Sequence, residues 1–289
     1  MLVEEEGYSR RQFLKRAAGV VATSFVGSVT LSESSVPVIP ADYRELWHIL
    51  SLPTESPELG QKTSELLSFV GVERPCDVRW IHRADTVSEL DEFFDSSLHI
   101  AEVDFRFDLD RGLYIGHDRG DRTRANVGYI NDKLIRTEPP KTIKYDCKDR
   151  SSIREVIMSA KPDRPCILNA GIYGSPHYQM NPQDFVDSVH DHDLVVLSPG
   201  RNLHIPGYSE EMLASLQKLA QDNPDHDFTV PIHIQELMAG IDHFLPLLEI
   251  PSLTLTVFRT RGYGLNQGHV DWLRENLSDH LRAKTFFDL

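Results

Sequence analysis

Short apolar runs and amphipathic stretches alternate along most of the chain. After residue 77, runs rich in Val, Ile, Leu and Phe recur, and most are followed by a stretch with apolar residues three or four positions apart. This alternation predicts strands connected by helices. The expected strands are 78–82, 100–107, 142–147, 166–170, 194–198, 228–233, 253–259 and 284–289, and the expected helices are 87–94, 152–160, 182–190, 210–219, 235–248 and 268–277.

Strands that alternate with helices pair in parallel, and each helix crosses over the sheet. The eight expected strands favour a (β/α)8 barrel of the TIM type, and a doubly wound open sheet is the alternative. The sequence ends on the eighth strand, and no helix is expected after it. A helical stretch over 41–70, interrupted near Pro53 and Pro57, is expected to cover that gap or to plug the bottom of the barrel.

The first residues have the pattern of an export signal. A motif typical of a twin-arginine signal lies at residues 9–15 (SRRQFLK), and an apolar run over 17–29 follows it. This run is shorter than the ~20 residues that span a bilayer, so we expect an extracytoplasmic protein, secreted or tethered by an uncleaved signal. A basic amphipathic helix is the structural alternative. The expected parts are a signal and linker over 1–35, a helical extension packed on the barrel over 36–70, and the barrel over 71–289.

The composition is that of a globular protein, because 40% of the residues are hydrophobic and 26% are charged. The formal net charge of −14 argues against a nucleic-acid partner, since it offers no basic face to a phosphate backbone. Cys76, Cys147 and Cys166 are too few for a disulfide framework and lack the spacing of a zinc site. We expect buried thiols, and one disulfide is the alternative.

Polar residues lie where the expected strands end, which is where barrel enzymes form their active sites. His82 closes the first strand, and the second strand carries Glu102 and Asp104. These two carboxylates face the same way because side chains alternate along a strand. Burying two like charges side by side requires a cation or a basic group nearby. A further extended segment over 112–116 ends at His117.

The third strand adds another carboxylate, since Lys144, Asp146 and Lys148 share one face. A set of carboxylates supplies only oxygen ligands, which suits Mg²⁺ or Ca²⁺. The expected ligands of one such cation are Glu102, Asp104 and Asp146. The expected acid–base pair, which would move protons at a phosphoryl group, is His82 and His117.

Each part of this pattern also has a structural interpretation. Glu102 and Asp104 could lie on a solvated face or form a salt bridge with Arg106, and Asp146 could be a structural carboxylate paired with lysine. His117, which is followed by an aspartate, could belong to a turn. The occurrence of all these residues in one ordered set favours the functional interpretation.

The set resembles the glycerophosphodiester phosphodiesterase superfamily, which includes the sphingomyelinase D-like phospholipases. That superfamily has His-Arg at the first strand end, Glu-x-Asp on the second strand, His-Asp soon after, and carboxylate-x-Lys on the third. The matching positions are His82-Arg83, Glu102/Asp104, His117-Asp118 and Asp146/Lys148. The resemblance implies the metal and acid–base roles given above, and it implies that Arg83 and Lys148 bind phosphate.

Within that superfamily the chain is more similar to the menorin-type proteins. Residues 80–82 (WIH) resemble their Trp-x-His, and residues 144–148 (KYDCK) resemble their Lys-Leu-Asp-Phe-Lys. Residues 168–170 (LNA) resemble the start of their Leu-Asn-Ala-Asp segment. Asn169 interrupts an apolar strand where those proteins carry the same residue, so we expect it to contact the substrate, and a structural hydrogen bond is the alternative.

These observations predict an exported phosphodiesterase that depends on Mg²⁺ or Ca²⁺. The expected substrate is a glycerophosphodiester or the headgroup of a (lyso)phospholipid, with a membrane surface as a further candidate contact. The alternative is a secreted binding or adhesion module that keeps the barrel without catalysis. A glycosidase that uses Glu102 with another carboxylate is a third interpretation, but it leaves both histidines unexplained.

Overall fold

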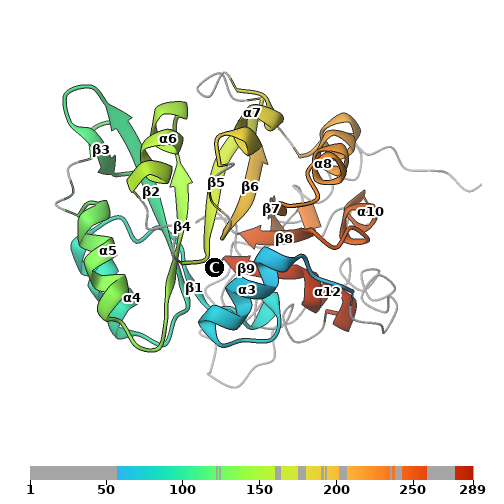
Figure 1. Ribbon diagram of the computed structural model, residues 1–289, viewed down its shortest axis with the longest axis horizontal. Coiled ribbons are helices and arrows are strands. Elements are labelled where there is room, and N and C mark those ends of the chain that lie inside the picture. The colour runs from blue at the N-terminus through green and yellow to red at the C-terminus, as the bar shows by residue number, and fades with distance from the viewer. Residues whose placement is uncertain are drawn as a thin grey trace, which may run out of the picture.

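The structure is a computed structural model that describes residues 57–121, 123, 125–159, 164–174, 180–189, 192, 194–201, 207–234, 236–237, 243–258 and 277–288 (Figure 1). The expected export signal and most of the expected helical extension lie outside these residues. No described helix is both long enough and apolar enough to cross a membrane.

Eight parallel strands form a nearly closed barrel, which confirms the expected fold class (Figure 1). The strands pair with their neighbours in chain order. β3 (Gly112–Ile115) is outside this order and pairs antiparallel with the end of β2. The parallel strands are β1 (Trp80–Ile81), β2 (Ile100–Asp108), β4 (Thr142–Cys147), β5 (Cys166–Tyr173), β6 (Val195–Arg201), β7 (Asp227–His233), β8 (Leu253–Phe258) and β9 (Thr285–Asp288).

Helices cover the outside of the barrel, and several begin at caps that the sequence supplies (Figure 1). Thr86 and Glu89 form a capping box at the start of α4, and Asn181 and Asp184 form another at the start of α7. The helices that lie between or after the strands are α4 (Val87–Asp95), α5 (Val127–Arg136), α6 (Arg150–Ser159), α7 (Pro182–Asp187), α8 (Glu210–Asp222), α10 (Leu245–Leu248) and α12 (Asp279–Lys284).

The first and last strands meet through their side chains. Trp80 of β1 packs against Phe286 of β9, with ring centroids 5.7 Å apart in an edge-to-face arrangement. A doubly wound open sheet would keep its first and last strands apart. The contact therefore excludes that alternative and identifies the fold as a barrel.

The boundaries of β1 and β9 differ from the expected ones. β1 contains only Trp80–Ile81, because the 3₁₀ helix η2 (Pro75–Asp77) precedes it and Arg83 turns the chain with a φ of 62°. Lys284 is the last residue of α12, so β9 begins at Thr285. Most of the expected helix 268–277 lies outside the described residues.

The helix α5 was not expected, although its buried residues have helical spacing. Val127, Ile130 and Leu134 lie three and four positions apart and face the core, and Asn126 caps the first turn. All three cysteines are free, so the alternative of a disulfide is not formed; Cys76 and Cys147 are buried as expected, whereas Cys166 is only partly buried.

The helix α3 (Gln61–Val70) closes the barrel at the end where the strands begin. Its Leu66 and Leu67 are buried against inward-facing residues from the first positions of several strands. This group, called the plug cluster below, is Leu66, Leu67, Val78, Trp80, Ile100, Ile167, Val196 and Phe286. This helix therefore lies at the bottom of the barrel, and the polar side chains occupy the opposite end.

Replacing Leu66 tests the contribution of the plug cluster. Leu66→Ala is expected to lower the free energy of unfolding by about 2–5 kcal/mol, because Leu66 is fully buried. Ser68→Ala, on the exposed face of the same helix, is the control and is expected to change it by less than about 0.5 kcal/mol. Urea denaturation measures both values, and equal values would show that α3 adds nothing to the core.

Candidate active site

The registers of the parallel strands bring the predicted polar residues together inside the barrel. Glu102 of β2 pairs with Lys144 of β4, and two positions further on Asp104 pairs with Asp146. Asp146 in turn pairs with Asn169 of β5. Because side chains alternate along a strand, all five share the face that points into the barrel. The strands thus form two polar levels near their carboxyl ends.

Lys144 is the cation at the centre of the first level. Its Nζ lies 2.5 Å from Glu102 Oε2 and 2.6 Å from Asp288 Oδ2, and all three side chains are at most 4% exposed. Burial favours the neutral form of Asp288, but the charges of Lys144 and His82, together with the hydrogen bonds to this carboxyl, outweigh burial and lower its pKa well below the ordinary value. These three side chains therefore form a buried ion-pair network.

His82 joins this network from the end of β1. Its Nδ1 lies 3.2 Å from Asp288 Oδ1 and 3.5 Å from Glu102 Oε2. Burial lowers the pKa of the imidazole, whereas the two carboxylates raise it, and the net effect raises it to about 11. His82 is therefore held as a cation through Nδ1, which leaves Nε2 as the nitrogen available for another group.

Asp104 is fully buried, and neither of its carboxylate oxygens has a hydrogen-bond partner among the described residues. Lys148 Nζ lies 3.0 Å from Oδ1 and Arg83 Nε lies 3.5 Å from Oδ2. Burial is the main reason that the pKa of Asp104 is raised well above its ordinary value, and Lys148 opposes this shift. Since a buried carboxylate without hydrogen bonds is costly, further positive charge beside Asp104 would stabilise it.

Asp146 is held by partners on both of its oxygens. Lys148 Nζ binds Oδ2, and Asn169 Nδ2 donates a hydrogen bond to Oδ1 at 2.8 Å. Asn169 Oδ1 accepts a hydrogen bond from Ser198 Oγ at 2.7 Å. Both polar atoms of the Asn169 amide thus form hydrogen bonds within the protein. The bond from Nδ2 orients Asp146, and the bond to Oδ1 orients the amide. The contact of Asn169 with a substrate stays a prediction.

Glu102, Asp104 and Asp146 suit a cation site by position and by chemistry. Each offers one carboxylate oxygen, and these atoms all lie within 4.8 Å of one another. Oxygen donors are the ligands that Mg²⁺ and Ca²⁺ prefer. The two oxygens of Asp104 that lack hydrogen bonds are the strongest sign that a cation fits here.

The balance of charges in the site also favours a bound cation. Five carboxylates face three side chains with a permanent positive charge, and His82 adds one further charge when protonated. A divalent cation would offset this excess of negative charge. The carboxylates are Asp85, Glu102, Asp104, Asp146 and Asp288, and the permanent cations are Arg83, Lys144 and Lys148.

The turn after β1 places Arg83 and Asp85 at the edge of the site. Arg83 has a φ of 62°, a conformation that residues with a side chain rarely adopt. After this turn, Ala84 N–H donates to Glu102 O at 2.8 Å, and Asp85 Oδ1 accepts a hydrogen bond from Asp104 N–H at 2.9 Å. Arg83 stays 46% exposed, so its expected phosphate contact is open to a ligand and stays a prediction.

His117 lies just past the β2–β3 hairpin. Gly116 N–H donates to Asp104 O at 2.9 Å, so the hairpin returns the chain to the level of the carboxylates. His117 Nδ1 lies 3.1 Å from Asp118 Oδ1, and its side chain is 42% exposed. Its ring thus contacts Asp118 rather than the buried carboxylates.

Arg106 donates from Nε to His117 O at 2.7 Å. It forms no ion pair with a described carboxylate, so the salt bridge considered for Glu102 and Asp104 is not formed.

Asp288 and Asp85 belong to the site, although no role was expected for either. Asp288 ends the last strand two positions after the inward-facing Phe286, so the alternation that identifies Glu102 and Asp104 also applies to it. Asp85 precedes the helix cap Thr86 and has no such signal. The hydrogen bond that Asp85 accepts from Asp104 of β2 depends on the turn at Arg83.

A family model described as the Menorin N-terminal domain matches residues 75–289. The matched range contains every site residue described above. The chain belongs to the menorin N-terminal domain family. This menorin domain coincides with the described barrel, since it begins at the first residue of η2 and extends through β9. No curated protein matches the sequence.

Two solved structures are similar to this menorin domain at a low level. A glycerophosphoryl diester phosphodiesterase from Parabacteroides distasonis is 13% identical over 78% of this chain and 77% of its own, with a TM-score of 0.35. A candidate glycerophosphodiester phosphodiesterase from Galdieria sulphuraria is 11% identical over 71% of this chain and 94% of its own, with a TM-score of 0.33. Scores this low carry no argument about activity.

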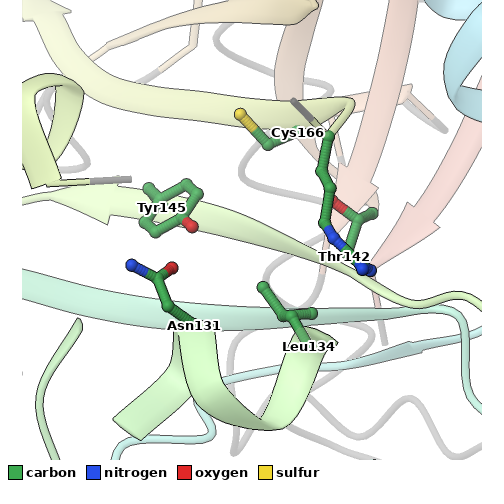
Figure 2. Close-up of a pocket in the computed structure, with 6 residues that line it drawn as sticks. Asn131, Leu134, Thr142, Tyr145 and Cys166 are labelled. Carbon is green, nitrogen blue, oxygen red and sulfur yellow. The ribbon is translucent and has the colours of Figure 1, made fainter. Parts of the chain in front are cut away.

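A small cavity of the menorin domain lies away from the candidate site, between α5 and the strands β4 and β5 (Figure 2). Its volume of about 10 Å³ is the space of one water molecule, and Asn131 Oδ1 is buried beside it with no hydrogen-bond partner in the described part of the chain. Burial raises the pKa of the Cys166 thiol to about 12, which favours its protonated form at neutral pH. The lining residues are Asn131, Leu134, Thr142, Tyr145, Arg164 and Cys166.

Replacing Lys144 tests the buried ion-pair network of the menorin domain. Lys144→Met is expected to lower the free energy of unfolding by about 3–5 kcal/mol, because Glu102 and Asp288 stay buried without their cation. Lys218→Met is the control: it breaks the exposed Lys218–Asp222 pair on α8 and is expected to cost less than about 0.5 kcal/mol. Urea denaturation at neutral pH measures both. A Lys144→Met protein as stable as the control would contradict a structural role for the network.

Proposed function

We propose that this protein is an exported phosphodiesterase that depends on a divalent metal. The proposed substrate is a small phosphodiester, such as a glycerophosphodiester or a lysophospholipid headgroup. The observation that carries the proposal is the group of three carboxylates, Glu102, Asp104 and Asp146, within 4.8 Å of one another on the inward face of β2 and β4. Asp104, buried without hydrogen bonds to its oxygens, supports a cation at this place.

Glu102, Asp104 and Asp146 would hold Mg²⁺ or Ca²⁺. Bound there, the cation would supply positive charge to the oxygens of a phosphoryl group. Arg83, 46% exposed at the edge of the site, and Lys148, 20% exposed beside Asp104, are the proposed phosphate contacts. Asn169, which pairs with Asp146 across β4 and β5, is proposed to contact the substrate.

His82 and His117 form the proposed acid–base pair. Both imidazoles are oriented in the same manner, since Asp288 holds Nδ1 of His82 and Asp118 holds Nδ1 of His117. Each ring therefore keeps Nε2 for the substrate. One histidine takes the proton of the attacking hydroxyl or water, and the other gives a proton to the leaving oxygen.

A secreted binding or adhesion module without catalysis is the second candidate. It is favoured by the ion pairs of Lys144 and Lys148, which already neutralise much of the carboxylate charge. Because of these pairs, the barrel could remain stable without a bound metal.

Turnover of phosphodiesters by the purified protein tests the proposal. We expect hydrolysis of a glycerophosphodiester and lysophospholipid panel with Mg²⁺ or Ca²⁺, and its loss with a chelator. Asp104→Asn is expected to abolish the metal-dependent turnover, and His117→Ala is expected to lower kcat by about 10²–10⁴-fold, the usual contribution of a general acid or base. Phosphorus NMR of the products measures the rate and distinguishes a cyclic phosphate from a hydrolysed ester.

Two variants that conserve the site serve as controls. Asp108→Asn changes a carboxylate of the same strand that pairs with Arg111 instead, and His243→Ala changes an exposed histidine outside the site. Both are expected to keep wild-type activity. If no substrate turns over while the wild type binds a cation in calorimetry and Asp104→Asn does not, the binding module replaces the enzyme as the proposed function.

Export by the twin-arginine route is part of the proposal and rests on residues 9–15. Replacing Arg10 and Arg11 with lysine is expected to keep the protein in the cytoplasm, because this route recognises the arginine pair. Arg16→Lys is the control, since it changes a basic residue outside the pair. Fractionation of cells that possess this route measures the distribution, and unchanged export of the double variant would contradict the proposal.

A further inference from the structure

We infer that Arg106 binds the phosphoryl oxygens of the substrate directly and so selects an anionic ligand. This inference rests on the proposed function and adds a residue to which that proposal gives no role. It follows from the position of Arg106, from the hydrogen bonds that it makes, and from the pairing of the other cations in the site.

Arg106 lies on the same face of β2 as the carboxylates. Side chains alternate along a strand, so Glu102, Asp104 and Arg106 form one row that runs toward the open end of the barrel. Arg106 is partly buried at the end of this row. A ligand that enters from the open end and reaches Asp104 therefore passes Arg106.

The guanidinium of Arg106 is held in place by one hydrogen bond, and most of its N–H donors have no partner among the described residues. Its Nε donates a hydrogen bond to the backbone carbonyl of His117 at 2.7 Å. A guanidinium has five N–H donors, and the two terminal nitrogens of Arg106 have no partner among the described residues. The single hydrogen bond thus places an available positive charge beside a proposed acid–base residue.

The other cations of the site are each paired with two carboxylates. Lys144 binds Glu102 and Asp288, whereas Lys148 and Arg83 each approach two others. Any charge that they offer to a phosphate is therefore shared with carboxylates of the site. Arg106 differs from them because no described carboxylate oxygen lies within ion-pair distance of it.

The geometry of a guanidinium suits a phosphodiester in particular. Its terminal nitrogens can donate two parallel hydrogen bonds to the two non-bridging oxygens of one phosphate. A protein with a net charge of −14 also repels anions in general, so an unpaired cation at the entrance has a large effect on which ligand binds. The expected ligand is thus a phosphodiester, and a neutral ester of the same size is not.

Replacing Arg106 with glutamine tests the inference. Arg106→Gln removes the charge and keeps an amide that can donate to His117 O. It is expected to raise KM for the phosphodiester and to weaken binding of inorganic phosphate by about 10-fold or more, since a charge-assisted hydrogen bond contributes that much. Arg106→Lys keeps the charge but loses the paired donors, so an intermediate loss is expected. Arg79→Gln, an exposed arginine just before β1 at the other end of the barrel, is the matched control and is expected to change neither value.

Phosphate titration in a second background separates direct binding from positioning of His117. If Arg106 contacts the anion, Arg106→Gln weakens phosphate binding equally in the wild-type and His117→Ala proteins. If the loss disappears in the His117→Ala protein, Arg106 acts only through that ring, and the inference is overturned.

The two proposals fail in different ways. A wild type that turns over phosphodiesters, with Arg106→Gln unchanged in KM and phosphate affinity, overturns the role of Arg106 alone. A wild type that neither binds phosphate nor turns over any ester overturns the proposed function and the inference together. If Arg106→Gln does not fold, Arg106→Lys decides, and wild-type phosphate affinity in that variant overturns the inference.

Discussion

Carboxylates buried inside a barrel require positive charge close by, and the interior of this protein is arranged around that requirement. Lys144 supplies the charge for Glu102 and Asp288, and Lys148 supplies it for Asp104 and Asp146. Removing two charges from water costs more than an ordinary contact returns, so such pairs persist only where the geometry is good. The register of β2 with β4, which sets these residues at matching heights, is therefore the basis of the site.

The bottom of the barrel is apolar and its open end is charged, and the charged end depends on the apolar one. At the bottom, Leu66 and Leu67 of α3 seal the plug cluster and exclude water from the inward face of the strands. Electrostatic interactions just above this seal are stronger than in water because the surroundings are less polar. The apolar plug thus increases the effect of the charged groups that occupy the open end.

Most of the fold and part of the site could be predicted from local patterns. Alternation along β2 identified Glu102 and Asp104, and the polar ends of the strands marked the correct end of the barrel. The helix α5 shows the opposite case, since Val127, Ile130 and Leu134 carry a helical pattern that was not assigned. Asp288 likewise followed the alternation rule, but its partners could not be read from the sequence near it.

The sequence by itself determined the strands, the face on which each polar side chain lies, and the family of the chain. The strands and the faces of their side chains are local properties, because they depend on residues two to four positions apart. The tertiary structure decided which charges meet: His82 and Asp288 are 206 residues apart in the sequence, and Lys144 and Asp288 are 144 apart. Only the closing of β9 against β1 brings them together.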